Sequence, residues 1–219
     1  MKTVAIIDYG MCNLFSVNQA CLTVGLNPRI TCNKEELLAA DAIILPGVGA
    51  FGEAMENIRR LDLVEPIKDF LASGRQFMGI CLGMQLLFSE SEEFGRHTGL
   101  NVIEGNVRKF GENNSTRVKI PQIGWNQILP PSEDSWVKSP LRDLISGSYM
   151  YFVHSYYVEP AQKSDILSYT QYHSTEYCSS VMRSNVFATQ YHPEKSGEKG
   201  LTIYRNWALS VERQTSEDE

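Results

Sequence analysis

The sequence predicts an α/β fold, in which a mostly parallel β-sheet with helices on both faces is extended by a mixed or antiparallel β region. Two observations lead to this prediction. In the first half, short apolar runs alternate with stretches whose apolar residues recur at helical spacing. This alternation requires crossover connections, which produce parallel strands covered by helices. In the second half, short β-like runs are joined by turn-forming residues, a pattern typical of antiparallel strands.

Four strands are expected in the first half. Three of them are short apolar runs, and the second, at residues 28–31, is a weak strand. The first strand ends at Asp8 and the third ends at Pro46. In α/β folds the active site lies at the carboxyl ends of the strands, so the residues that follow these runs are the first candidates for chemistry. The runs cover residues 4–7, 28–31, 42–45 and 77–80.

Helices are expected between these strands. A first set of apolar residues recurs at helical spacing up to Gly25, where a helix would stop; it comprises Val17, Cys21 and Val24. Asn33 followed by Glu36 predicts the capped start of a short helix. A third helix would end at Gly74, and one over residues 82–88 would follow the fourth strand. The apolar face of the third helix comprises Leu63, Val64, Ile67, Phe70 and Leu71.

The second half predicts strands over residues 102–110, 127–129, 150–153, 166–172, 181–183 and 186–190. Loops are expected at residues 113–115 and 130–132, and a last helix at residues 201–211. Neither a repeat nor a linker interrupts the chain, so we expect one domain over residues 1–219. Its polar tail, from about residue 212, is expected to be frayed.

Composition narrows the functional class. The 219 residues are 42% hydrophobic and 21% charged, which suits one ordinary globular core. A net charge of -6 argues against a uniformly basic nucleic-acid surface. The five cysteines form no C-x-x-C pair, so neither a disulfide framework nor a zinc site is expected, and a reducing cytoplasm fits best. No apolar stretch is long enough for a membrane helix or a signal peptide.

Cys81 is the candidate nucleophile. It follows the fourth strand directly, within a G-x-C-x-G pattern from Gly79 to Gly83. Such glycines permit a sharp turn from strand to helix that exposes the central side chain. The N-terminus of the following helix would favour a thiolate, and the N–H of Leu82 would point toward a developing oxyanion. The alternative is a buried structural cysteine, which is the interpretation we keep for the other four.

A thiol nucleophile needs a base, and His192 is the candidate among four histidines. It follows an apolar strand, and Glu194 lies two residues further on. In an extended chain these two side chains face the same side, so the carboxylate can hold the imidazole tautomer. Pro193 favours an extended conformation at His192. The alternative is a surface His-Pro-Glu turn.

Together these motifs resemble the class I (triad) glutamine amidotransferases. Further segments resemble, more narrowly, the glutaminase subunits of imidazole glycerol phosphate synthase, over residues 4–206. The resemblance implies a flavodoxin-like, mostly parallel sheet with flanking helices. The segments that carry it are residues 8–14, 46–52, 79–85, 124–126, 151–156 and 192–196.

The resemblance also implies roles at matched positions. Cys81 would attack the side-chain amide of glutamine to give a thioester and ammonia. His192 would act as base and then acid, and Glu194 would orient it. Backbone N–H groups of Val48 or Gly49 and of Leu82 would form the oxyanion hole. The glutamine would be held by Gly49, Gln85, His154, Ser155 and Tyr156.

No metal or organic cofactor is expected. The chain lacks a phosphate-binding G-x-x-x-x-G-K motif, so the acceptor reaction is expected on another polypeptide. The resemblance implies a (β/α)₈-barrel cyclase as heterodimer partner. Ammonia would be channelled to it for the synthesis of imidazole glycerol phosphate and an aminoimidazole carboxamide ribotide in histidine biosynthesis. Asn13, Trp125 and Lys195 would face this partner.

Two departures from the family pattern occur, Cys12 for a more usual glycine and Gln122 for a more usual histidine. Both lie in segments that the resemblance places toward the partner. They leave open a glutaminase that serves a different synthase, such as one that aminates a surface sugar. Two further alternatives are a thiol hydrolase of γ-glutamyl peptides and a non-catalytic regulatory subunit.

Overall fold

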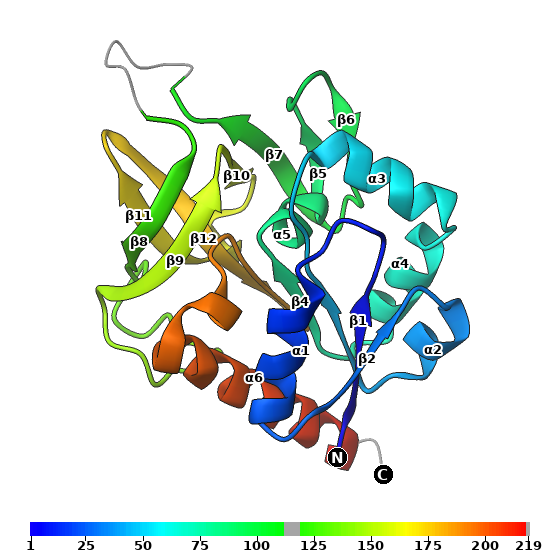
Figure 1. The fold of residues 1–219 in the computed structure, drawn as a ribbon. Helices are drawn as coiled ribbons and strands as arrows, with labels where there is room; N and C mark the ends of the chain where they lie inside the picture. Colours follow the sequence, from blue (N-terminus) through cyan, green and yellow to red (C-terminus); the bar gives the residue numbers. More distant parts are fainter. Residues whose placement is uncertain (112–118, 218–219) are drawn as a thin grey trace.

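A computed structural model describes residues 1–111 and 119–217 of the chain (Figure 1). Its main feature is an 11-stranded sheet. Neighbouring strands in one part of this sheet are parallel, and helices cover both faces of that part, which confirms the predicted α/β fold (Figure 1). In spatial order these strands are β2 (Asn27–Thr31), β1 (Thr3–Ile7), β3 (Ala42–Leu45), β4 (Phe77–Ile80) and β13 (Val186–Thr189).

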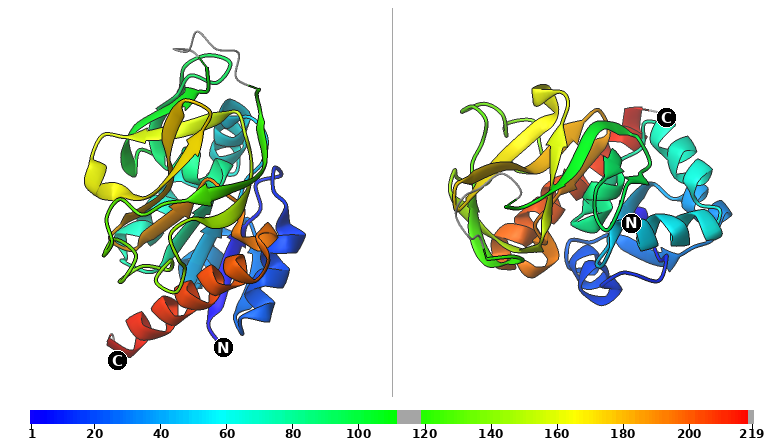
Figure 2. Two further views of the ribbon diagram at one scale, coloured as in Figure 1. Left: turned by 90° about the vertical axis from the view of Figure 1, so that its left-hand side faces the viewer. Right: turned by 90° about the horizontal axis from the view of Figure 1, so that it is seen from above.

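The predicted β extension begins where β12 (Thr175–Arg183) pairs antiparallel with β13. The sheet continues through β10 (Tyr156–Pro160), β7 (Ile103–Lys109), β5 (Phe88–Ser91) and β6 (His97–Thr98), while β11 (Ile166–Tyr172) pairs with β12. A second, two-stranded sheet consists of β8 (Gln122–Ile128) and β9 (Ser148–His154). Figure 2 shows this extension beside the helix-flanked half of the molecule.

Two groups of helices cover the parallel strands (Figure 1). On one face lie α1 (Leu14–Thr23) and α6 (Gly197–Glu217). On the other lie α2 (Lys34–Ala39), α3 (Phe51–Arg60) and α4 (Val64–Ala72). The short helix α5 (Leu82–Leu86) follows β4 directly, and two 3-10 turns occur, η1 (Lys163–Asp165) and η2 (Pro193–Lys195). Within the described ranges, no helix combines the length and the apolar character needed to cross a bilayer.

The core consists of two apolar clusters, one on each face of the sheet. Along β1, Val4 and Ile6 belong to the cluster shared with α1 and α6, whereas Ala5 and Ile7 belong to the cluster shared with α2, α3 and α4. Successive side chains of a strand point to opposite faces. A strand covered on both faces therefore needs apolar residues throughout, which explains the apolar runs of β1, β3 and β4, whereas the edge strand β2 is partly exposed and contains polar residues.

Several boundaries differ from the sequence expectation. Helix α3 was not expected, and α5 ends at Leu86 because Phe88 already belongs to β5. Strand β8 begins at Gln122 rather than at residue 127. Its Gly124 and Asn126 have low β-propensity, but pairing with β9 along seven residues outweighs this. Strand β12 begins at residue 175 because it pairs with the whole of β11.

The chain beyond residue 211 also differs from the expectation. The tail that was expected to be frayed from about residue 212 continues as helix α6 to Glu217. The loop expected at residues 113–115 lies outside the described residues. The predicted loop at residues 130–132 follows the end of β8.

The cap of α2 gives a test of the fold. The side chain of Asn33 accepts a hydrogen bond from the N–H of Glu36 at 2.9 Å, as the sequence predicts. Asn33→Ala leaves this N–H without its acceptor, so we expect the free energy of unfolding to fall by about 1 kcal/mol. Asn33→Asp keeps the acceptor and should retain stability. Urea unfolding of both variants measures the difference, and equal losses in the two would contradict the capping role.

Candidate active site

Cys81 occupies a strained turn between β4 and α5. Its φ is 55° and its ψ is -108°, a left-handed conformation that is unfavourable for a residue with a Cβ atom. The surrounding structure holds it there, because its N–H donates to the carbonyl oxygen of Thr189 on β13 at 2.7 Å. The turn places the side chain at the carboxyl end of the parallel strands. This is the elbow that the sequence predicts.

The two glycines of the elbow are required by space rather than by φ. A Cβ atom on Gly83 would lie 1.8 Å from the carbonyl oxygen of Leu45, and one on Gly79 would lie 3.0 Å from the Cβ atom of Ala188. The backbone of α5 therefore packs directly on the end of β3. Any larger residue at position 83 must move one of these two backbones.

His192 and Glu194 form a buried pair. Nδ1 of His192 lies 2.7 Å from Oε1 of Glu194, and the two side chains are only 2% and 1% exposed. The pair forms across the 3-10 turn η2, whereas the sequence spacing suggests an extended segment. His192 itself is extended, as the following proline predicts. A second contact positions the backbone, since the N–H of His192 donates to the carbonyl of Tyr151 on β9 at 2.9 Å.

The electrostatics of His192 favour its protonated form. Burial alone would lower its pKa, but the interactions with Cys81 and with Glu194 outweigh burial and raise the pKa to about 10. Nε2 of His192 is buried and has no hydrogen-bond partner among the described residues. The imidazolium can therefore serve as counter-ion to a thiolate and as a proton donor to a leaving group.

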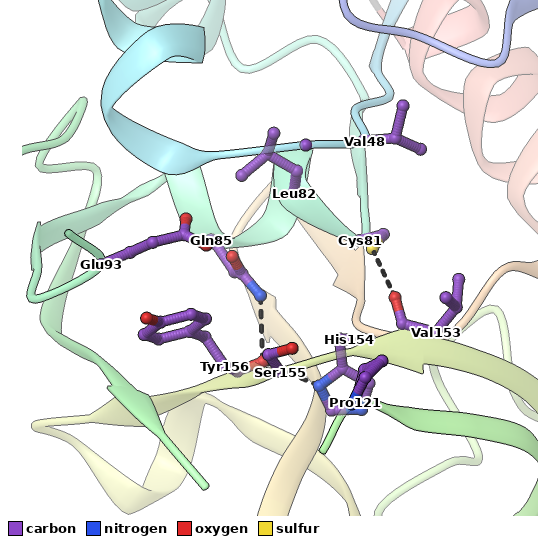
Figure 3. Close-up of a pocket in the computed structure, with 11 residues that line it drawn as sticks. Val48, Cys81, Leu82, Gln85, Glu93, Pro121, Val153, His154, Ser155 and Tyr156 are labelled. Carbon is purple, nitrogen blue, oxygen red and sulfur yellow. Dashed lines mark hydrogen bonds between the residues drawn. The ribbon is translucent and has the colours of Figure 1, made fainter.

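A cavity of about 300 Å³ opens above Cys81 (Figure 3). Figure 3 shows the sulfur of Cys81 directed toward the carbonyl oxygen of Val153, 3.9 Å away. Eight of the sequence-predicted site residues line the cavity: Val48, Gly49, Cys81, Leu82, Gln85, His154, Ser155 and Tyr156. His192 and Glu194 instead line a smaller space on the α1 side, together with Asn13.

The predicted oxyanion donors are not equivalent. The N–H of Val48 donates to the carbonyl oxygen of Met11 at 2.9 Å, so it could reach a substrate oxygen only after that bond breaks. Gly49 has a φ of +102°, and a Cβ atom at this position would lie 2.6 Å from Cε of Met11. Leu82 opens α5, where the first N–H groups have no partner within the helix.

Gln85 is held by the protein more tightly than the sequence indicates. Its Nε2 donates to the carbonyl oxygen of Tyr156 at 3.1 Å and to Oε1 of Gln190 at 2.9 Å. Figure 3 shows this nitrogen directed toward β10 while the side chain borders the cavity. Gln85 therefore forms part of the cavity wall through its own hydrogen bonds.

His154 is held neutral. Burial lowers its pKa to about 4. Nδ1 lies 2.7 Å from the carbonyl oxygen of Tyr156, and Nε2 lies 3.2 Å from the hydroxyl of Tyr177. Because a carbonyl only accepts, Nδ1 carries the proton. The Tyr177 hydroxyl donates to Oε1 of Gln122 at 3.0 Å.

Sequence reasoning missed three residues of the cavity wall, Glu93, Pro121 and Val153. Glu93 is the most informative of them. Its Oε2 accepts a hydrogen bond from the N–H of Phe51 at 2.6 Å, and burial raises its pKa. Nothing in the run of serines and glutamates between residues 89 and 93 distinguishes it. Only the loop between β5 and β6 brings it to the cavity.

The residues expected to face a partner differ in their exposure and in their contacts. Trp125 on β8 is 56% exposed and contacts the ring of Tyr151 edge-on at 6.1 Å. Lys195 is exposed in η2, and Asn13 precedes α1 without capping it. The two departures differ in burial. Gln122 is 3% exposed, whereas Cys12 is half-buried and its Sγ donates to the carbonyl oxygen of Pro46 at 3.5 Å.

Comparison with known proteins identifies the family of the chain. The family model described as glutamine amidotransferase class-I matches residues 5–211. The subunit HisH of imidazole glycerol phosphate synthase from Geobacter metallireducens is 43% identical over 96% of this chain and 99% of its own length. The HisH subunit from Syntrophotalea carbinolica is 46% identical over 93% of this chain and 98% of its own length.

Solved structures show the same fold at lower identity. The structure of PurLQS from Thermotoga maritima superimposes with a TM-score of 0.72 at 18% identity, covering 96% of this chain and 100% of that one. The glutaminase domain of CTPS from Trypanosoma brucei, solved with bound acivicin, gives a TM-score of 0.66 at 17% identity, covering 97% and 94%. These similarities concern the fold alone.

The packing of the elbow predicts a large effect for Gly83→Ala. The added methyl group would meet the backbone of Leu45, and backbone cannot rotate away, so we expect a loss of about 3 kcal/mol in the free energy of unfolding. Gly52→Ala is the matched control. Its methyl group would meet only the side chain of His97, which can move. Urea unfolding that shows equal losses would contradict the tight approach of α5 to β3.

The buried neutral His154 predicts a dependence of stability on pH. Its pKa is about 4 when folded and 6.5 ordinarily. Above pH 6.5, His154 is neutral in both the folded and the unfolded chain and does not change the free energy of unfolding with pH. As the pH falls from 6.5 to about 4, His154 binds a proton in the unfolded chain but not in the folded chain, so the free energy of unfolding falls. By pH 5 this amounts to about 2 kcal/mol.

His154→Gln should remove this contribution, so its stability should fall less between pH 7 and pH 5 than that of the unmodified protein. His173→Gln, at an exposed histidine, is the control and should keep the original pH slope. The measurement is urea unfolding at both pH values. Parallel slopes for all three proteins would show that His154 is not held neutral by burial.

Proposed function

The chain belongs to the class I glutamine amidotransferase family, and on this premise we propose that it is the glutaminase subunit of an imidazole glycerol phosphate synthase. The observation that carries the proposal is the buried bond of 2.7 Å between His192 and Glu194, beside a cysteine held on a strained elbow. A base fixed by a carboxylate next to a nucleophile in a cavity is the arrangement required for acyl transfer. The HisH relatives, at 43% and 46% identity over almost the whole chain, support the choice of synthase.

The reaction proceeds through a thioester. The Cys81 thiolate attacks the side-chain carbonyl carbon of glutamine, and the N–H groups of Leu82 and Gly49 stabilise the oxyanion. The His192 imidazolium then gives its proton to the departing nitrogen, so that the C–N bond breaks and ammonia leaves. The neutral imidazole next takes a proton from a water molecule that attacks the thioester. The C–S bond then breaks and expels the Cys81 thiolate, which restores the thiolate–imidazolium pair, and the acid that is released loses its proton to solvent to give glutamate.

The cavity wall supplies groups for the amino-acid end of glutamine. The carboxylate of Glu93 borders the cavity and suits the α-ammonium group. Backbone groups of Ser155 and Tyr156, which also line the cavity, suit the α-carboxylate and the side-chain amide. Neutral His154 closes the cavity floor without adding a charge that would compete with Glu93.

The ammonia is consumed on a partner. We place the (β/α)₈-barrel cyclase at the surface around Asn13, Trp125 and Lys195, because Trp125 is an exposed aromatic side chain at the edge of the site and such residues dominate interfaces. Direct transfer of ammonia to this partner avoids its protonation in bulk water. The products there are imidazole glycerol phosphate and an aminoimidazole carboxamide ribotide, in histidine biosynthesis. Five free cysteines suit a reducing cytoplasm.

The proposal predicts glutamate release that depends on Cys81. We expect the protein mixed with a cyclase and the ribonucleotide ligand of that cyclase to hydrolyse glutamine faster than the protein alone. Cys81→Ala should lower the stimulated rate by about 10³-fold or more, because no other group can form the thioester. Cys32→Ala, at an exposed cysteine, is the matched control and should keep the full rate. The measurement is glutamate formed per minute in each mixture.

Two results would overturn parts of this proposal. An unchanged rate in Cys81→Ala would show that the chain is not a thiol glutaminase. Glutaminase activity that depends on Cys81 but ignores the cyclase would keep the chemistry and assign the chain to a different synthase, such as one acting on a sugar.

A further inference from the structure

The amide of Gln190 lies against the reactive sulfur. Gln190 follows β13 directly, and the parallel register that pairs Thr189 with Ile80 sets it beside Cys81. Its Nε2 donates to Sγ of Cys81 at a distance of 3.6 Å. The side chain of Gln190 is 0% exposed, so water cannot replace this contact. The proposed roles of Cys81 and His192 do not explain why the buried amide of Gln190 contacts the sulfur.

The direction of the Gln190 amide is determined by its other end. Oε1 of Gln190 accepts a hydrogen bond from Nε2 of Gln85 at 2.9 Å, and the same Nε2 donates to the carbonyl oxygen of Tyr156 at 3.1 Å. A carbonyl oxygen only accepts, so the Gln85 nitrogen must face it and must also face Gln190. Gln190 therefore presents oxygen to Gln85 and its NH₂ group to the sulfur. The reverse orientation would set two donors against each other.

We propose that Gln190 is a catalytic residue that stabilises the Cys81 thiolate by a hydrogen bond to Sγ, and that Gln85 is the positioning residue that aims it. The inference rests on the proposed role of Cys81 as nucleophile. His192 supplies the opposite charge from one side of the sulfur, and Gln190 supplies a neutral donor from the sheet. An NH₂ donor binds a thiolate more strongly than a thiol, because hydrogen bonds to charged groups are the stronger ones.

This role has a kinetic signature that simple packing lacks. Removing a donor to the thiolate lowers the fraction of thiolate at a given pH, by about tenfold for one such bond. The thiolate that remains is more basic and therefore intrinsically more nucleophilic, by about threefold for that change. Below the midpoint of its pH profile a variant without the donor should react about threefold more slowly. On the high-pH plateau it should react about threefold faster.

The test is alkylation of Cys81 by iodoacetamide from pH 5 to pH 10, in the unmodified protein, in Gln190→Met and in Gln190→Glu. The rates are read by mass spectrometry on two tryptic peptides, residues 76–96 for Cys81 and residues 30–34 for the exposed Cys32. Cys32 serves as an internal reference for the reagent and for the integrity of the fold. Gln171→Met, at an exposed glutamine on β11, is the control for the substitution itself.

We expect the half-maximal pH of Cys81 alkylation to rise by about one pH unit in Gln190→Met, with a crossing of the two rate profiles. Gln190→Glu keeps an acceptor for Gln85 but turns an oxygen toward the sulfur, so its shift should be larger. If Gln190→Met fails to fold, the near-isosteric Gln190→Glu provides the test through the shift in its half-maximal pH. Profiles that superimpose on that of the unmodified protein, even with glutamine turnover reduced, would overturn the proposal. Because alkylation needs no turnover, that result leaves the proposed glutaminase function standing.

Discussion

The hydrogen bond from the N–H of Cys81 to the carbonyl of Thr189 is the contact on which the site depends. It extends the parallel pairing of β4 and β13 by one residue beyond the last pair, Ile80 with Thr189. Residues 190 to 194 are thereby set beside residue 81, although more than one hundred residues separate them in the chain. The same bond helps to hold Cys81 in a left-handed conformation. One backbone contact thus couples the strain of the elbow to the placement of Gln190 and His192.

Burial gives these groups their chemical character. His192 and Glu194 are almost fully enclosed, and an isolated charge in such a place would be very costly. Three pairs of polar groups near the sulfur are therefore matched: imidazole with carboxylate, one amide with the next, and His154 with a tyrosine hydroxyl. A network of this kind tolerates few substitutions, because removing one member leaves a buried partner unsatisfied. The oxyanion side is less complete, since the N–H of Val48 is already bound to Met11.

Much of this arrangement could be predicted from the sequence. Four of the five parallel strands are short apolar runs, which identifies them, and the elbow is marked by its glycines. The features that sequence reasoning missed depend on contacts between segments that lie far apart in the sequence. Gln122 and the rest of β8 form a strand because β9 is opposite, and Glu93 reaches the cavity through a loop between two short strands. Gln190 appears in sequence as the polar end of an apolar run, and only the register with β4 reveals what its amide contacts.

The order of these segments along the chain has a consequence for biosynthesis of the protein itself. Cys81 leaves the ribosome more than one hundred residues before Gln190, His192 and Glu194. Until those residues are synthesised, the thiol has none of the neighbours that surround it in the folded protein. Those neighbours reach it only when β13 takes its place between β4 and β12. The environment of the sulfur is therefore completed by a segment of the chain that is made long after the sulfur itself.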